Sequence, residues 1–272
     1  MPRTPFALWP IVALAAFLPA CDRQPPPPAP ASRPAATPPE LGDVMTNALG
    51  MKLAYVPPGE LVMGSPLAEP GRHDDEAQHG VVLTRGFWIG VTEVTQAQWN
   101  AVMAPAGTDA EPNDLPVVRV KWGQAVAFCR TLSERDGNQY RLPTEAEWEH
   151  ACRAGTTGPF AGAADEVAWH MDNSDEALHA VAGKKPNAWG LYDMHGNAAE
   201  WCADRYGPYA PGEAVDPTGP AEGTYRVVRG GSFGHFSRAC RSAARASYNP
   251  AYGLRRVGFR IVMEQPPAAS AR

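Results

Sequence analysis

The chain has 272 residues and a formal net charge of -5 at pH 7, from 24 lysines and arginines against 29 aspartates and glutamates. Hydrophobic residues make up 44% and charged residues 19% of the sequence, an ordinary composition for a globular protein with its own core. A slightly acidic chain has no general attraction for nucleic acid or for anionic lipid surfaces. We therefore expect no nucleic-acid partner.

Residues 1–20 have the parts of an export signal. Arg3 supplies a positive charge, residues 6–18 are apolar but too few to span a bilayer, and Ala20 is a small residue before Cys21. This pattern is typical of a bacterial lipoprotein signal, after which the Cys21 thiol would carry lipid. The protein would then be anchored at the periplasmic face of the cell envelope. The alternative is an ordinary secretory signal that happens to meet a cysteine.

Proline dominates residues 24–40, with alanine, serine and threonine between. Such a sequence favours polyproline II, a semi-rigid spacer of roughly 3 Å per residue. We expect residues 21–40 to form a stalk that holds a domain clear of a membrane, and residues 265–272 to be a disordered tail. No second linker or repeat interrupts residues 41–264, which are predicted to form one domain.

Three helices are predicted in this domain. Thr95 is placed to cap the first, and Gly137 to end a second whose apolar residues recur at helical spacing over residues 125–132. The third is the clearest, because Thr144 and Glu147 form a capping box. Runs of β-branched and aromatic residues predict strands at 53–56, 81–83, 87–89, 225–228 and 257–262. With 26 glycines and 29 prolines, the mixture indicates an α+β fold with long irregular loops.

Seven groups of short motifs follow one another along the domain. They lie at residues 55–59 with 63–65, 88–89 with 93–95, 116–117 with 122, 141–148, 190–201, 229–232 and 258–260. In this order they resemble the formylglycine-generating enzyme family, also called sulfatase-modifying factors, over nearly the whole domain. The resemblance implies a variant of the C-type lectin fold with few helices and strands.

The resemblance also implies a reaction, which this chain departs from. Active members oxidise a sulfatase cysteine to formylglycine with O2 and a Cu(I) ion that two cysteines hold. The first of these lies three residues after the serine that corresponds to Ser232, where this chain has His235. Counted without a gap, Cys240 stands at the position of the family's second copper-binding cysteine. When the arginine-rich segment that follows is aligned with that of the family, however, no cysteine stands at this position. Ala199 replaces a further family tryptophan, so we do not expect the copper mechanism.

His235 and Cys240 are the remaining candidates for a different metal site in this vestigial centre. Imidazole and thiolate both bind copper or zinc, and a loop can bring the two together. We favour a simpler interpretation, a loop histidine and a disulfide-bonded cysteine, because no third ligand lies nearby in the sequence.

Four cysteines remain once Cys21 carries lipid, an even number for an oxidising compartment. Family members often have cysteines at the positions of both Cys152 and Cys240, so the resemblance implies a Cys152–Cys240 disulfide. Whether Cys129 and Cys202 pair or stay free is left open.

The motif at residues 190–201 resembles the family's calcium loop. The resemblance implies side-chain oxygens from Asp193 and Glu200 and backbone carbonyls from Gly196 and Ala198 as ligands. A hard cation prefers such oxygens, and a glycine turn can direct carbonyls inward. The alternative is a solvated acidic loop; we favour calcium.

Arginines crowd the last third of the chain. Guanidinium groups suit carboxylates, sulfates and carbonyls, so they either bind an anionic or peptide ligand or pair with acidic residues to lock loops. We expect the structural role for the motif residues Arg229, Arg245 and Arg260. The candidates for ligand binding are Arg238, Arg241 and Arg255.

These observations favour a lipid-anchored envelope protein that lacks the copper-binding pair and binds or helps to mature another exported protein or peptide-like molecule. One alternative is a divergent oxidase that activates sulfatases with altered metal ligation. Another is a calcium-stabilised structural module of a surface complex. Copper titration separates the oxidase from the other two.

Overall fold

The structure is a computed structural model that describes residue 1, residues 38–104 and residues 113–265. The predicted signal peptide, Cys21, the stalk up to residue 37 and the tail from residue 266 lie outside the described residues. The chain from Pro39 to Arg272 forms one compact unit. No described helix is long and apolar enough to cross a membrane.

The largest sheet has five antiparallel strands, and the last strand of the described residues lies inside it. Their order is β1 (Val44–Thr46), β2 (Lys52–Val56), β5 (Phe87–Gly90), β14 (Val262–Glu264) and β6 (Tyr140–Arg141). Strand β14 pairs with β5 on one side and β6 on the other, so the last strand ties the first third of the chain to its middle.

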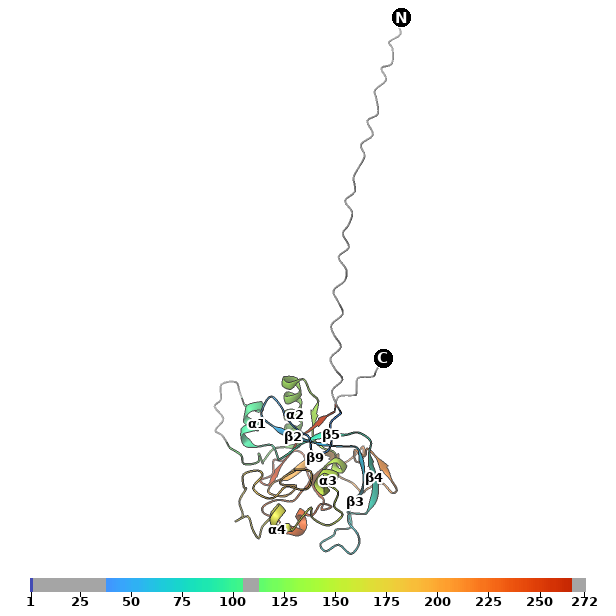
Figure 1. Cartoon of the computed structure of the whole chain (residues 1–272), viewed down its shortest axis with the longest axis vertical. Helices are drawn as coiled ribbons and strands as arrows, with labels where there is room; N and C mark the ends of the chain where they lie inside the picture. Colours follow the sequence, from blue (N-terminus) through green and yellow to red (C-terminus); the bar gives the residue numbers. More distant parts are fainter. Residues whose placement is uncertain (2–37, 105–112, 266–272) are drawn as a thin grey trace. The chain divides into compact units, whose positions relative to one another are not determined.

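Three smaller sheets complete the strand structure (Figure 1). One has the order β10 (Ala214–Val215), β4 (His79–Leu83), β3 (Gly59–Met63). Another has the order β12 (Ala246–Tyr248), β11 (Arg226–Arg229), β9 (Ala199–Arg205), β13 (Val257–Gly258). The third is the parallel pair β7 (Ala168–Trp169) and β8 (His195–Gly196).

The three predicted helices are present. They are α1 (Gln96–Met103), α2 (Trp122–Asp136) and α3 (Glu145–Arg153). The domain also has a short helix α4 (Ala164–Val167) and a 3-10 turn η1 (Ser237–Cys240). Thr95 and Thr144 each cap a helix with a complete capping box, and α2 ends at Gly137 in the left-handed conformation. All residues of α3 are buried, so this helix lies in the interior.

Strand β9 separates two apolar clusters. Successive side chains of a strand point to opposite faces. Accordingly Trp201 packs with Phe128 and Phe259 in one cluster, whereas Cys202 packs with Trp148 in the other. The rings of Phe128 and Phe259 meet edge to face at 5.3 Å, a favourable aromatic geometry. The strand therefore lies between the cluster that contains residues of α1 and α2 and the cluster that contains residues of α3.

The structure confirms the α+β class and contains short strands that were not predicted, among them β1, β3 and β12. It differs from the prediction most in two further places. Residues 199–205, in and after the presumed calcium loop, form β9, because they lie between two partner strands. The predicted strand 257–262 is broken, since the carbonyls of Phe259 and Ile261 accept hydrogen bonds from Val94 N and Gly90 N. The break places Arg260 in the interior.

Candidate functional site

The loop after β11 carries the position where the family's first copper cysteine would lie. Gly231 makes the turn with φ 67°, and a Cβ atom there would lie 2.6 Å from the Cys240 sulfur. Ser232 follows and is fully buried. Its Oγ lies 2.8 Å from Nδ1 of His235, and the His235 backbone N–H donates to the Ser232 carbonyl. The structure therefore joins these two residues in a hydrogen-bonded pair.

His235 also lines a small pocket of about 70 Å³, with His73, Arg245 and Tyr248 on its other walls. Sites for drug-sized ligands are several times larger, about 300 Å³ and more, so this pocket has room for no more than a few water molecules. Burial and the nearby Arg256 lower the pKa of His235, so the imidazole is neutral at pH 7.

Cys240 is not among the residues that line this pocket. Its side chain is fully buried, and its sulfur lies 4.0 Å from the carbonyl oxygen of Phe236. Burial raises the pKa of the thiol to about 12. The thiol is therefore protonated at neutral pH in the metal-free protein. Of the vestigial centre, the structure pairs Ser232 with His235 and places the Cys240 sulfur beside the Gly231 turn, where the Ser232 backbone N–H hydrogen-bonds to it.

The predicted Cys152–Cys240 disulfide is not formed, because all four cysteines of the described residues are free thiols. The Cys152 sulfur instead lies 3.6 Å from Nε2 of His195, and Nδ1 of that ring lies 2.7 Å from the Cys240 carbonyl oxygen. Burial raises the pKa of Cys152 to about 12, and a hydrogen bond with Ser242 opposes the rise. A histidine ring and a serine hydroxyl are thus the polar neighbours of Cys152.

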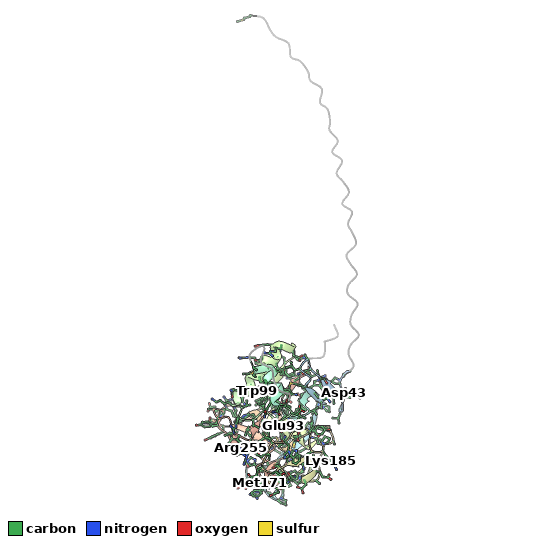
Figure 2. All side chains as sticks on the ribbon, turned by 90° about the vertical axis from the view of Figure 1, so that its left-hand side faces the viewer. Asp43, Glu93, Trp99, Met171, Lys185 and Arg255 are labelled. Atoms are coloured by element: carbon green, nitrogen blue, oxygen red, sulfur yellow. The ribbon has the colours of Figure 1, made fainter. Side chains whose placement is uncertain are left out.

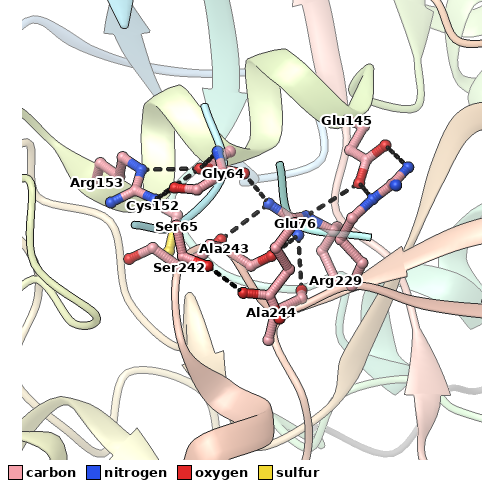
Figure 3. A network of polar contacts seen from close by, with 12 residues as sticks. Gly64, Ser65, Glu76, Glu145, Cys152, Arg153, Arg229, Ser242, Ala243 and Ala244 are labelled. Carbon is pink, nitrogen blue, oxygen red and sulfur yellow. Dashed lines mark hydrogen bonds and ion pairs between the residues drawn. The ribbon is translucent and has the colours of Figure 1, made fainter. Parts of the chain in front are cut away.

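The three motif arginines form buried ion pairs, as expected, and Figure 3 shows Arg229 among its polar contacts. Arg229 is fully buried, pairs with Glu149 of α3 and donates to the carbonyls of residues 242–244. The Arg245 pair to Glu145 and the Arg260 pair to Glu200 each span 2.7 Å. A buried guanidinium needs both an opposite charge and hydrogen-bond acceptors, and these carboxylates and carbonyls supply most of them. The exception is Nε of Arg229, which makes no hydrogen bond and lies 3.7 Å from Glu145.

One of the three arginines named as ligand candidates is structural, which corrects the prediction. Arg241 is 1% exposed and pairs with Glu69 and Glu76, two carboxylates of the loop between β3 and β4. Its guanidinium therefore has no face left for a ligand. Arg238 and Arg255 are exposed, over the rings of Phe236 and Phe233 respectively.

The predicted calcium loop is tightly constrained. Gly196 has φ 88°, and an added Cβ would lie 2.0 Å from the Trp169 carbonyl oxygen. Asp193 has the unusual φ of 57° and is buried, with Oδ2 accepting a hydrogen bond from Ala182 N. Glu200 is already engaged, because Arg260 binds both of its oxygens and Trp148 donates to one.

The sequence did not single out Glu93, which completes this cluster and lies in the interior of the domain (Figure 2). Its Oε1 accepts a hydrogen bond from Ala198 N at 3.0 Å. The remaining oxygens, Glu93 Oε2 and Asp193 Oδ1, are buried without any hydrogen-bond partner. Burial, followed by the charges of Asp193 and Glu200, raises the pKa of Glu93 well above its usual value. Its place in a family motif, three residues before the start of α1, was the one available signal.

These orphaned oxygens test whether a cation fits. Two buried carboxylate oxygens without donors need a proton or a metal ion. Among the described residues, no three His, Cys, Asp or Glu side chains are arranged to hold a metal by themselves. A hard cation here would therefore take Asp193 and Glu93 together with backbone carbonyls of the loop, with Glu200 held by Arg260 beside them.

Known proteins resemble the chain along the whole domain. Residues 42–265 match the sulfatase-modifying factor enzyme 1-like domain. The formylglycine-generating enzyme of Streptomyces coelicolor is 31% identical over 92% of this chain and 96% of its own length. The chaperone protein LppX of Paenibacillus barcinonensis is 28% identical over 56% of this chain and 71% of its own.

Two solved structures share the fold, a variant of the C-type lectin fold. Treponema denticola variable protein 1 is 30% identical with a TM-score of 0.73, over 82% of this chain and 99% of its own. PvdO from Pseudomonas aeruginosa is 27% identical with a TM-score of 0.74, over 84% and 100%. By the extent of these matches and by its motifs, the chain belongs to the sulfatase-modifying factor family.

Proposed function

We propose that the chain is a lipid-anchored protein of the bacterial envelope that does not use the family's copper chemistry. Its domain instead binds, or helps to mature, another exported protein or peptide-like molecule. The observation that carries this proposal is the Ser232–His235 hydrogen bond at the position of the first copper cysteine. The anchor is inferred from the signal-like residues 1–20 and Cys21.

The chemistry of Cu(I) supports the first part. Cu(I) is a soft ion that prefers a pair of thiolates in low coordination. Here His235 offers an imidazole with one nitrogen engaged by Ser232, and Cys240 is buried and is not among the residues that line the pocket beside His235. The residues present therefore do not fit a two-thiolate copper site.

The helper role is supported by relatives and by the scaffold. LppX is named a chaperone, and it matches over half of this chain. The buried arginine pairs keep the loops of the domain in place although the copper cysteine is missing. A family scaffold that keeps its shape without the oxidation centre is suited to holding another molecule.

A copper titration tests the proposal. The purified chain would be titrated with Cu(I) and then incubated with O2 and a cysteine-containing peptide, beside the Streptomyces coelicolor enzyme as a positive control. We expect no stoichiometric copper binding and no aldehyde in the peptide. Tight binding of one copper per chain together with oxidation of the peptide would establish the alternative, a divergent formylglycine-generating oxidase.

The anchor has its own test. Cells that express the chain would be fed a labelled fatty acid and separated into membrane and soluble fractions. We expect label on the protein and its recovery with membranes, and loss of both in Cys21→Ser. A wild-type chain without label would show that residues 1–20 are an ordinary secretory signal.

We further propose that Asp193 and Glu93 hold calcium with carbonyls of the loop at Gly196 and Ala198. A bound cation would neutralise the two orphaned oxygens and stabilise the folded state by an amount that grows with the logarithm of its concentration. Unfolding would be followed with calcium, with chelator, and in Glu93→Gln. We expect chelator to lower the midpoint of the wild type and to have a smaller effect in the variant. An unchanged wild-type midpoint would contradict calcium binding.

A further inference from the structure

A pocket of about 510 Å³ lies at the end of β9 and β11 remote from His235. Phe87 of β5, Thr144 before α3 and Pro217 form parts of its wall, with Arg205 and Arg226 from the two strands. Its volume is in the range of sites for small organic molecules. Neither the vestigial centre nor the calcium loop contributes to the residues that line it.

Charges line this pocket unevenly. Arg141 pairs with Glu147 and Glu264, and this accounts for two of the carboxylates in the wall. The third, Asp216, accepts hydrogen bonds from both the backbone and the hydroxyl of Thr84. Among the described residues, no carboxylate lies within 4.0 Å of the side-chain nitrogens of three further wall residues, Arg85, Arg205 and Arg226.

Arg205 and Arg226 stand directly opposite one another in the antiparallel pair of β9 and β11. Like charges at such positions destabilise a sheet. Burial, followed by the charge of Arg205, lowers the pKa of Arg226, and the charge of Asp204 opposes this shift without cancelling it. The neighbouring Asp204 points to the other face of β9, where its carboxylate accepts a hydrogen bond from Glu145 N. The repulsion in the pocket is therefore not offset by a carboxylate within ion-pair distance.

Arg226 is held in place despite this repulsion. Its guanidinium lies 3.7 Å from the centre of the Trp122 ring and donates to the Ala203 carbonyl at 2.6 Å. Stacking and one hydrogen bond leave its other N–H groups free, and a guanidinium that is already oriented loses little freedom when it binds. The two facing arginines destabilise the free protein, and the guanidinium of Arg226 is already oriented to bind an anion.

We propose that this pocket binds a ligand through a doubly charged phosphate group, held between Arg205 and Arg226. Two unpaired guanidinium groups match the charge of a phosphate monoester, and the guanidinium fork fits phosphate oxygens with two hydrogen bonds. The ligand is either a soluble phosphate monoester or the phosphate headgroup of a lipid, since both present the same group. The inference is independent of the proposed copper loss and anchor.

Calorimetric titration with phenyl phosphate tests the pocket, with phenyl sulfate as the singly charged comparison. The matched variants are Arg205→Gln in the pocket and Arg130→Gln, which removes an exposed arginine on α2 outside it. We expect phosphate to bind more tightly than sulfate and Arg205→Gln to weaken it by about tenfold or more, with Arg130→Gln unchanged. Equal binding by both variants would overturn the proposal.

A second arm separates the two sources of phosphate. The Cys21→Ser chain, which cannot carry lipid, would be floated with phosphatidylcholine vesicles with and without phosphatidic acid. Binding that requires phosphatidic acid and Arg205 assigns a lipid headgroup, whereas phenyl phosphate binding without flotation assigns a soluble ligand. Failure in both arms would overturn the proposal.

The unliganded protein gives an independent readout. Arg205→Gln removes the cross-strand repulsion, so its thermal midpoint without ligand should rise above that of the wild type. Added phosphate should then raise the wild-type midpoint more than that of the variant. A lower midpoint for unliganded Arg205→Gln would show that Arg205 supports the fold, against its assignment to a ligand.

Discussion

Gly196 shows how little freedom the loop before β9 has. Its φ of 88° suits glycine, and a methyl group would meet the Trp169 carbonyl at 2.0 Å. Gly196→Ala should lower the free energy of unfolding by about 2–5 kcal/mol, from backbone strain and overpacking. Gly123→Ala is the control, because its Cβ would meet no atom within 4 Å and α2 favours alanine. Urea unfolding of both variants measures the difference, and equal losses would contradict the geometry.

Buried ion pairs are the second feature at the residue scale. Arg229→Met should cost about 3–5 kcal/mol, because Oε2 of Glu149 and the carbonyls of residues 242–244 lose their buried donor, while Arg153 pairs only with Oε1 of Glu149. Arg130→Met breaks the exposed pair with Glu134 and should cost at most about 1 kcal/mol. Urea midpoints of the two variants are the measurement. A loss at Arg229 as small as that at Arg130 would show that the buried carboxylate finds another partner.

At the scale of elements, β9 joins the two apolar clusters and also carries a carboxyl with an unusual pKa. Asp204 is 3% exposed, and burial, followed by the charge of Glu145, raises its pKa from 3.8 to about 7. The folded state therefore keeps a proton between pH 3.8 and about 7 that the unfolded chain has released. In this window the contribution of Asp204 to stability falls as the pH rises.

Asp204→Asn removes this titration and leaves an oxygen that can accept the hydrogen bond from Glu145 N. Relative to the wild type, the variant should gain stability from pH 4 to pH 7, by on the order of 1 kcal/mol per pH unit. Urea unfolding at several pH values measures the gain, with the exposed Asp74→Asn as the control. A difference between wild type and Asp204→Asn that is constant with pH would contradict the raised pKa.

The elements that the sequence predicted well are those set by local chemistry. The capping boxes at Thr95 and Thr144 and the glycine stop of α2 act over three or four residues, so their positions can be read directly. Strand β9 was missed because its pairing with β11 and β13 depends on distant segments. Short-range patterns do not contain that information.

The contacts of the candidate site also divide into local ones, which the sequence indicated, and long-range ones, which it did not. Ser232 and His235 are three residues apart, and their proximity follows from the turn at Gly231. The Glu93–Ala198 hydrogen bond spans 105 positions, and Arg241 reaches Glu76 across 165. The sequence therefore indicated the altered centre, but it did not show which carboxylates join the calcium loop or which arginines are consumed by ion pairs.

At the scale of the whole molecule, loops are held by charges that connect distant parts of the chain. Arg241 fastens the loop between β3 and β4, and Arg260 ties the segment before β14 to β9. Each buried pair fixes backbone that no strand or helix orders. A domain connected in this way depends on ion pairs and not on disulfides to order its loops, because the four cysteines of the described residues are free thiols.

The domain should accordingly fold without the segment that precedes it. Its apolar clusters, with the side chains packed against them, lie between Met45 and Met263. A chain that starts at Pro39 should keep the thermal midpoint of the whole protein, measured by scanning calorimetry. A chain that starts at Lys52 should melt lower, because it lacks β1, the antiparallel partner of β2, and Met51, a buried member of an apolar cluster. If the cut at Pro39 already lowers the midpoint, the proline-rich segment contributes to the fold and its assignment as a simple spacer is wrong.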